Sequence, residues 1–326
     1  MLKIGLIGTG TIAYSHALAI NKLEGLTLAA VSDIDEAKGK HFATEVKCGA
    51  FFTDYRDMLK NADLDVVGVC LPHYLHAPVG LAVLESGRHL LMEKPMANTV
   101  AECDALMAKA QAKGLKILVG HTHQYNASLR IARTLLDNGE IGRLTMIIDT
   151  IYAYYNWEKR APWLLDPVKG GGGPLMNTGP HQIDHLLYLT QSKPVRVDAC
   201  VQQNREGMAV ESDLSAHIQF ENGVTATLIL CQGYTPKTAE ISVRLIGTKG
   251  MMEIGPWGNV QLAQGNQTRE IVCEQVDGLE MEWKEFIAAI KENRNPITDG
   301  DYGKRVVALI EAIYRSGREK KPIELK

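Results

Sequence analysis

The pattern of apolar and polar positions changes near residue 121. Before that point, short apolar runs alternate with stretches that have apolar residues at helical spacing. The apolar runs are 3–8, 26–33, 66–72, 89–93 and 116–121, and the helical stretches are 12–22, 35–44, 78–86 and 100–113. Near-continuous apolar strands between helices predict a parallel, doubly wound sheet covered on both faces. Ligands of such sheets bind beyond the carboxyl ends of the strands.

After Tyr125 the segments become longer and alternate between apolar and polar residues. Strands are expected at 145–155, 195–203, 213–221, 224–232 and 239–247, and helices at 128–138, 181–189, 281–293 and 301–316. The turn signals 221–223 and 247–250 separate strands in the manner of antiparallel hairpins. We therefore predict an α/β protein with two domains. Residues 1–122 form the parallel sheet, and residues 123–326 form an α+β domain with a large, mostly antiparallel sheet.

The helices of the second domain are expected on one side of its sheet, which leaves the other face to be covered. A second copy of the chain is the simplest cover, so we predict a homodimer or homotetramer that assembles through this sheet.

Composition and charge limit the kinds of molecule that the protein is expected to bind. The 326 residues are 45% hydrophobic and 22% charged, with 35 basic against 38 acidic side chains. Without a polybasic run, neither nucleic acid nor an anionic membrane is expected as a partner. No signal peptide or membrane-spanning run is recognised, and six cysteines are scattered without a C-x-x-C pair. These features predict a cytoplasmic protein with reduced thiols.

The turn after the first strand carries the clearest chemistry. Residues 8–13 read G-x-G-x-x-A between a strand and a helix, and the second strand ends at Asp33. Gly8 permits the tight turn, Gly10 lets a pyrophosphate approach the backbone, and Ala13 keeps the helix close to the sheet. Asp33 is placed to accept hydrogen bonds from a ribose 2′-hydroxyl and would repel a 2′-phosphate, which favours NAD over NADP. The cofactor-binding residues expected here are Gly8, Gly10, Thr11, Ile12 and Asp33.

The tripeptide Glu93-Lys94-Pro95 ends the strand at 89–93. An ammonium group at the carboxyl edge of the sheet can hydrogen-bond a substrate hydroxyl and stabilise a developing alkoxide. Pro95 restricts the turn that aims the lysine. From the tripeptide alone, a surface salt bridge in a loop is an equally good interpretation.

A glycine-rich segment, 171–184, contains Asn177, Thr178, His181 and Asp184. Its glycines allow either a close approach to a ligand or a tight turn into a helix. His181 begins that helix, and histidine is the side chain whose ordinary pKa suits a base near neutral pH. Taken alone, His181 also fits a structural histidine at a helix start.

These motifs, in this order, resemble the Gfo/Idh/MocA oxidoreductases, the family of glucose–fructose oxidoreductase and inositol dehydrogenases. The glycine turn, the Glu-Lys-Pro tripeptide and the G-G-G-x-L-x-N-x-G-x-H-x-x-D pattern carry the resemblance. Segments 71–77, 87–95 and 138–142 agree with it, so the resemblance spans nearly the whole chain.

The resemblance implies an NAD(P)-dependent enzyme that oxidises a secondary hydroxyl of a sugar, sugar derivative or cyclitol, or reduces the matching ketone. Lys94 and His181 would be the catalytic pair, with the hydroxyl between them and the nicotinamide. His181 would take the hydroxyl proton while Lys94 polarises the oxygen, and Asn177 would orient the His181 ring.

The resemblance also implies contacts for further residues. Those expected on the nicotinamide side are Leu71, Pro72, His73, His76, Glu93 and Lys94. Those expected to bind substrate, besides Lys94 and His181, are His123, Asn156, Trp163, Thr178 and Tyr234. Ordinary domain packing explains Trp163 equally well.

Two positions depart from the family pattern. Many relatives have Asp where this chain has Asn177, and a neutral amide cannot add charge to support an imidazolium. Relatives often have Arg before the aromatic residue where this chain has Gln124-Tyr125, which argues against a strongly anionic substrate.

Other functions compatible with the sequence are a glycosidase that uses NAD for transient oxidation at C3, a non-catalytic dinucleotide sensor, and reduction of a non-sugar ketone or imine. A sensor would need neither Lys94 nor His181. His121 and His123 alternate at a strand end, but no carboxylate or cysteine follows at ligand spacing, so we predict no metal site.

Overall fold

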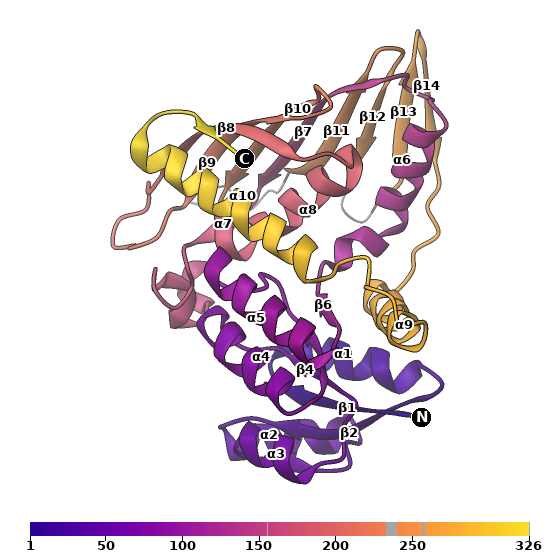
Figure 1. The fold of residues 1–326 in the computed structure, drawn as a ribbon. Coiled ribbons are helices and arrows are strands. Elements are labelled where there is room, and N and C mark those ends of the chain that lie inside the picture. Colours follow the sequence, from indigo (N-terminus) through magenta and orange to yellow (C-terminus); the bar gives the residue numbers. More distant parts are fainter. Residues whose placement is uncertain (155, 233–239, 256–257, 326) are drawn as a thin grey trace. The chain divides into compact units, whose positions relative to one another are not determined.

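The computed structural model describes residues 1–154, 156–232, 240–255 and 258–325 (Figure 1). The chain forms two compact units. The first contains residues 1–122 and 277–307, and the second contains residues 123–276 and 308–326. The break after residue 122 lies where the pattern changes along the sequence. Residues 277–307, which the sequence assigns to the second domain, belong to the first unit because the side chains of Trp283 and Phe286 pack into its core.

The first unit contains a six-stranded parallel sheet. Its strand order is β3-β2-β1-β4-β5-β6. The strands are β1 (Leu2–Ile7), β2 (Leu26–Ser32), β3 (Phe51–Phe52), β4 (Val66–Val69), β5 (His89–Met92) and β6 (Ile117–Val119). The predicted parallel sheet is confirmed, with the short β3 as an addition. Because β1, β4 and β5 are neighbours, the loops that follow them open at one edge of the sheet.

Helices cover both faces of this sheet (Figure 1). They are α1 (Thr11–Lys22), α2 (Glu36–Glu45), α3 (Tyr55–Asn61), α4 (His76–Glu85), α5 (Val100–Lys113) and α9 (Gly278–Lys291). One core joins the sheet to α1, α2 and α9 through residues such as Leu6, Ile20 and Trp283. The other joins it to α4 and α5 through residues such as Val83 and Leu106. Burial of apolar side chains on both faces explains the continuous apolar runs.

The second unit is built on a nine-stranded sheet. Its order is β14-β13-β12-β11-β7-β10-β9-β8-β15, and β7 and β10 are its parallel pair. The strands are β7 (Leu144–Tyr152), β8 (Pro194–Gln202), β9 (Asp213–Phe220), β10 (Thr225–Cys231), β11 (Glu240–Gly247), β12 (Met251–Ile254), β13 (Val260–Gln264), β14 (Gln267–Ile271) and β15 (Ile323–Glu324). The predicted, mostly antiparallel sheet is confirmed and extended at both edges.

Helices pack on one face of this sheet. They are α6 (Ala127–Asp137), α7 (Pro174–Asn177), α8 (Gly179–Thr190) and the second half of α10 (Gly300–Glu319). In β7 the buried, inward positions are Ile147, Asp149 and Ile151. Because Asp149 is a carboxylate on an otherwise apolar face, it needs a hydrogen-bonding partner, and side chains of α8 provide one.

The opposite face of the sheet is half-exposed. Register places Met146 and Ile148 of β7 beside Thr225 and Thr227 of β10, with Ile229 two residues farther along β10. Ile229 is 36% exposed.

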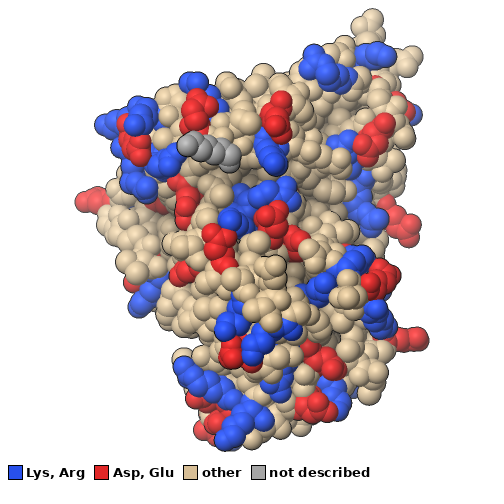
Figure 2. Space-filling model, viewed as in Figure 1, with Lys and Arg blue, Asp and Glu red and all other residues tan. Residues whose placement is uncertain are grey.

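Figure 2 shows basic and acidic side chains interspersed over the visible face. Within the described ranges, none of the helices is both long and apolar enough to cross a membrane.

Candidate active site

In the first unit, the turn between β1 and α1 has the geometry expected of a nucleotide-binding loop. Gly8 has φ +94°, and a Cβ there would collide with the carbonyl oxygen of Cys70. Gly10 lies in extended backbone at the N-cap of α1, and no described heavy atom lies within 4 Å of where its Cβ would be. The protein's own backbone therefore excludes other residues at position 8, whereas the open space beside Gly10 can admit a ligand. The first-turn N–H groups of α1 lack intrahelical acceptors, which suits a phosphate.

Asp33 lies beside this turn, at the end of β2. Its Oδ2 accepts hydrogen bonds from the Thr9 backbone N–H at 2.9 Å and the Thr9 hydroxyl at 2.6 Å, and its Oδ1 accepts from the Asp35 N–H at 3.0 Å. Partial burial opposes ionisation, but these hydrogen bonds outweigh it and lower the pKa of Asp33. Lys38 Nζ lies 3.7 Å from Oδ2. The carboxylate is thus charged and fixed at the position expected for a ribose contact.

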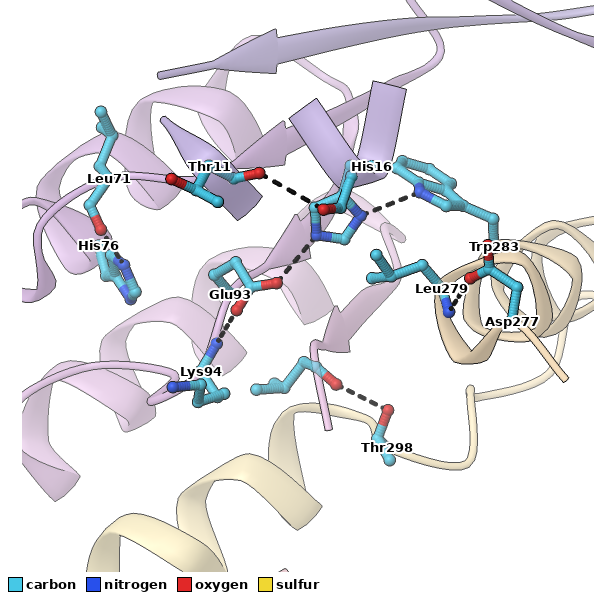
Figure 3. A network of polar contacts seen from close by, with 12 residues as sticks. Thr11, His16, Leu71, His76, Glu93, Lys94, Asp277, Leu279, Trp283 and Thr298 are labelled. Carbon is cyan, nitrogen blue, oxygen red and sulfur yellow. Dashed lines mark hydrogen bonds and ion pairs between the residues drawn. The ribbon is translucent and has the colours of Figure 1, made fainter. Parts of the chain in front are cut away.

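Glu93 and Lys94 follow β5 at the same edge of the sheet, where a buried network fixes the glutamate (Figure 3). Glu93 Oε1 lies 2.8 Å from Nε2 of His16 on α1, and Glu93 Oε2 accepts the Lys94 backbone N–H at 3.2 Å. The indole N–H of Trp283 on α9 donates to His16 Nδ1 at 3.1 Å. Because indole is only a donor, Nδ1 of His16 is an acceptor and Nε2–H donates to Glu93.

The electrostatics of this network keep Glu93 ionised. Burial opposes its charge, but the His16 hydrogen bond and the nearby Lys94 outweigh burial and lower the pKa of Glu93. Burial also lowers the pKa of Lys94, against the attraction of Glu93.

His76 connects the loops after β4 and β5. Its Nδ1 lies 2.7 Å from the carbonyl oxygen of Pro95, and its Nε2 lies 2.8 Å from that of Leu71. Burial lowers the pKa of His76. A neutral imidazole has one N–H and donates to one of these carbonyls at a time. The ring therefore braces the loops that carry Leu71 and Lys94, while its contact with a nicotinamide stays a prediction, as do those of Pro72 and His73.

In the second unit, the glycine-rich segment packs tightly. A Cβ on Gly172, whose φ is +148°, would collide with the Tyr314 hydroxyl. Glu211 accepts the N–H groups of Gly173 and Leu175 at 2.9 Å each, and accepts the Tyr314 hydroxyl at 2.7 Å. Of the two roles considered for the glycines, these contacts support the tight turn into α7 and α8.

Helix α8 brings His181 into a cluster of rings and carboxylates. The rings of His181 and His123 are stacked, with centroids 4.0 Å apart and planes 15° from parallel. Nδ1 of His123 lies 2.9 Å from Nε2 of His185, one turn along α8 from His181. His185 Nδ1 lies 2.7 Å from Oδ2 of Asp149 on β7. Burial alone would lower the pKa of His185, but the charge and hydrogen bond of Asp149 outweigh burial and raise it.

Two glutamines support this cluster. Gln182 Nε2 donates to Asp149 Oδ1 at 2.8 Å and to the Ile229 carbonyl at 3.1 Å, which ties α8 to β7 and β10. Gln124 Nε2 donates to Asp184 Oδ1 at 2.7 Å. The position at which relatives often have arginine is therefore used here to hold a buried carboxylate.

The other residues expected at the substrate are more dispersed. Asn177 ends α7, and the Thr178 hydroxyl donates to Gln232 Oε1 at 3.4 Å. Asn156 precedes the 3₁₀ turn Trp157–Lys159, and Trp163 is half-buried in the turn Pro162–Leu165. Tyr234 lies outside the described residues. Substrate contacts at all of these positions stay predictions.

Sequence reasoning did not find His16, Trp283, Asp149 or His185. A signal for Asp149 was present, since it interrupts the apolar side of an alternating strand. His185 carries a signal as well, because it shares a helix face with His181 at i+4 spacing. His16 and Trp283 are 267 residues apart, and no local pattern links them. Over the part of the chain with assigned structure, no group of three His, Cys, Asp or Glu residues is arranged to hold a metal ion.

Comparisons with known proteins agree with this arrangement. Residues 2–121 match the Gfo/Idh/MocA profile described as an oxidoreductase family with an NAD-binding Rossmann fold, and residues 129–253 match the GFO/IDH/MocA C-terminal domain. The chain is 31% identical over 227 residues to 1-carboxy-3-chloro-3,4-dihydroxycyclohexa-1,5-diene dehydrogenase of Comamonas testosteroni, covering 70% of this chain and 57% of that protein.

Two further proteins are similar over almost their full length. The 1,5-anhydro-D-fructose reductase of Ensifer adhaerens is 25% identical, covering 100% of this chain and 99% of the reductase. The crystal structure of aldose–aldose oxidoreductase from Caulobacter crescentus, complexed with glycerol, superposes with a TM-score of 0.91 at 26% identity, covering 99% of each chain.

Proposed function

Since the chain belongs to the Gfo/Idh/MocA family of oxidoreductases, whose N-terminal domain is an NAD-binding Rossmann fold, we propose that it transfers a hydride between a secondary hydroxyl of a sugar, sugar derivative or cyclitol and NAD. The observation that carries this proposal is in the parallel sheet. The glycine turn after β1 and the Glu93-Lys94 pair after β5 open at one edge, and Glu93 is buried and fixed there. NAD, when bound, supplies the hydride acceptor.

Lys94 and His181 handle the oxygen and its proton. The Lys94 ammonium donates to the hydroxyl oxygen and stabilises its negative charge as the C–H bond breaks. His181 accepts the hydroxyl proton as general base, and Asn177 orients its ring. The Glu93 carboxylate, which His16 holds in place, favours the ammonium form of Lys94 and supports this division of roles. In the reverse direction, the same groups return the proton to a ketone.

A neutral, hydroxyl-rich substrate fits the second unit. Thr178, Asn177 and the histidines near the start of α8 are hydrogen-bonding groups suited to sugar hydroxyls. Gln124 adds no positive charge, and it holds the carboxylate of Asp184. Two relatives named above, a reductase of an anhydro-sugar and an aldose oxidoreductase, support this class, whereas the cyclic diol in the name of the Comamonas relative carries a carboxyl group.

The test is absorbance at 340 nm while the protein, with NAD, is offered monosaccharides, inositols, anhydrosugars and glycosides. A substrate that yields NADH stoichiometrically would support the proposal and identify the hydroxyl class. Glycoside cleavage that needs NAD but yields no net NADH would instead establish the redox-assisted hydrolase. NAD binding without turnover of any compound would favour a sensor.

We also propose that the enzyme is cytoplasmic and assembles as a dimer or tetramer through the open face of its nine-stranded sheet. All six cysteines are free thiols, as suits a reducing compartment. The half-exposed apolar residues Ile148 and Ile229 lie on that face. Light scattering of Ile229→Lys against the parent protein tests the assembly, since a lysine there would oppose pairing of the two sheets. An unchanged mass would exclude this face.

A further inference from the structure

Three side chains of the second unit form a line of hydrogen bonds that ends beside His181. Asp149 Oδ2 lies 2.7 Å from His185 Nδ1, and His185 Nε2 lies 2.9 Å from His123 Nδ1. Asp149 is 1% exposed and His185 is 6% exposed. His123, at the outer end, is half-buried and stacks on the ring of His181.

The partners fix which nitrogens carry protons. A carboxylate only accepts, so His185 Nδ1 carries a proton and donates it to Asp149. When the line holds no extra proton, His185 Nε2 is an acceptor, His123 Nδ1–H donates to it, and His123 Nε2 has a lone pair. When the line holds one extra proton, His185 is an imidazolium whose Nε2–H donates to His123 Nδ1. His123 Nε2 then carries a proton. Both hydrogen bonds persist in both states: His185 Nδ1–H donates to Asp149 throughout, and only the bond between His185 Nε2 and His123 Nδ1 reverses its direction.

We propose that Asp149, His185 and His123 form a proton-accepting chain that takes up the hydroxyl proton through His123 Nε2. This inference rests on the proposed function and adds a second route for the proton beside His181. The hydroxyl O–H bond breaks and an N–H bond forms at His123 Nε2. The His123 Nδ1–H bond breaks and an N–H bond forms at His185 Nε2. The C–H electron pair leaves as hydride to NAD, so the protein gains one proton and no electrons.

The charge of Asp149 outweighs the cost of burial at His185 and favours storage of the proton at the inner end. The imidazolium of His185 would face Asp149 on β7 and the neighbouring Asp184 of its own helix, while His123 and His181 are the other titratable rings of the cluster. An ion pair in a poorly hydrated site is stronger than one in water. Gln182 holds the other oxygen of Asp149, so the carboxylate stays oriented during transfer.

The chain also bears on the substitution at position 177. Asn177 is neutral, so it adds no charge to support an imidazolium. Asp149 is a buried carboxylate, and two hydrogen bonds link it to the ring that stacks on His181. His123 and His185 therefore act together with His181, and Asp149 acts through His185 as a positioning residue.

Two conservative substitutions interrupt the chain at different bonds. In His185→Asn, the amide nitrogen can replace Nδ1 and keep the bond to Asp149, but the link to His123 is lost. In His123→Asn, the amide nitrogen can keep the bond to His185, but the outer nitrogen is lost. His217→Asn is the matched control, because His217 lies exposed on β9 of the same unit. We expect kcat for oxidation to fall roughly 10²-fold in each chain variant, with the KM for NAD unchanged and one ionisation missing from the pH–rate profile.

A second measurement reads the chain without substrate. In the wild-type protein with ¹⁵N-labelled histidine, NMR titration should show His185 gaining its second proton in the same coupled step in which His123 changes tautomer. Below that step His123 should carry its proton on Nε2, and above it on Nδ1. The two Asn variants supply the assignments, and either one suffices if the other fails to fold.

The outcomes separate this inference from the proposed function. If His181→Ala loses activity while His185→Asn keeps the kcat and pH profile of the parent, the proton-accepting chain is refuted and the proposed function stands. If no alcohol is oxidised by the parent, the proposed function fails, and the NMR titration alone tests whether the proton-accepting chain exists. Independent titration of the two rings would overturn it in either case.

Discussion

Trp283 and His16, which lie 267 residues apart, are joined by a hydrogen bond from the indole N–H to imidazole Nδ1 at 3.1 Å. Both side chains are fully buried. The bond fixes the tautomer of His16, and with it the donor that holds Glu93 beside Lys94 (Figure 3).

Replacing Trp283 with phenylalanine keeps an aromatic ring but removes this donor. The buried Nδ1 of His16 then lacks its partner, which costs about 1–3 kcal/mol of unfolding free energy. Urea denaturation measures the loss. Tyr14→Phe, on the exposed side of α1, is the control and should change stability by no more than ~0.5 kcal/mol. Equal stability of Trp283→Phe and the parent would show that the hydrogen bond contributes nothing.

The two glycines of the β1–α1 turn should respond oppositely to alanine. Gly8→Ala forces a Cβ into the Cys70 carbonyl at φ +94°, so we expect a large fall in the melting temperature. Gly10→Ala places its methyl group in open space, so the fold should persist while the Kd for NAD rises about tenfold or more. Thermal denaturation and NAD titration distinguish these effects. Unchanged NAD affinity in Gly10→Ala would contradict a phosphate at this turn.

Cofactor choice should depend on Asp33. In Asp33→Ser the repulsion of a 2′-phosphate is gone and Lys38, 3.7 Å from Asp33 Oδ2, is released to pair with it. We expect the ratio of kcat/KM for NAD to that for NADP to fall. Adding Lys38→Ala to Asp33→Ser should remove most of the gain with NADP. The same ratio in Asp33→Ser as in the parent would refute the assignment of Asp33 to the ribose.

Lys94→Ala and His181→Ala should each lower kcat by ~10²–10⁴. Affinity for NAD should be nearly intact in both, because neither change removes the glycine turn or Asp33. Binding measured by quenching of protein fluorescence, beside single-turnover rates, separates the two quantities. The exposed His41→Ala is the control. Turnover at the parental rate in either variant would reject the proposed mechanism.

The stability contributed by His185 should depend on pH. Its pKa is raised in the folded protein, against burial, by Asp149 and Asp184. A raised pKa contributes stability that is fully present below the unfolded value of about 6.5 and is lost as pH rises through the folded value. The free-energy difference between the parent and His185→Asn should therefore be larger at about pH 6 than at about pH 9. Urea denaturation at both values provides the check, and a constant difference would show that His185 is not charged when folded.

Local patterns in the sequence determined most of the fold. Apolar periodicity predicted the parallel and antiparallel sheets. A strand that is buried on both faces is apolar throughout, whereas a strand that is buried on one face alternates between apolar and polar residues. Periodicity did not predict short elements such as β3 and the 3₁₀ turns, because a segment of two to four residues is too short to show a period. The glycine turn and the Glu93-Lys94 pair could also be located from the sequence, since each is a contiguous motif. Asp33 reaches the turn only because β1 pairs with β2.

Only the tertiary structure decided which distant groups meet. Packing between elements far apart in the chain produces three features of the structure. They are the inclusion of residues 277–307 in the first unit, the Trp283–His16 hydrogen bond, and the hydrogen-bonded line from Asp149 to His123. Hydrogen bonds have a reach of about 3 Å and a fixed direction. A sequence can show that a buried Asp149 needs a partner, but only the packing of α8 on β7 shows that the partner is His185.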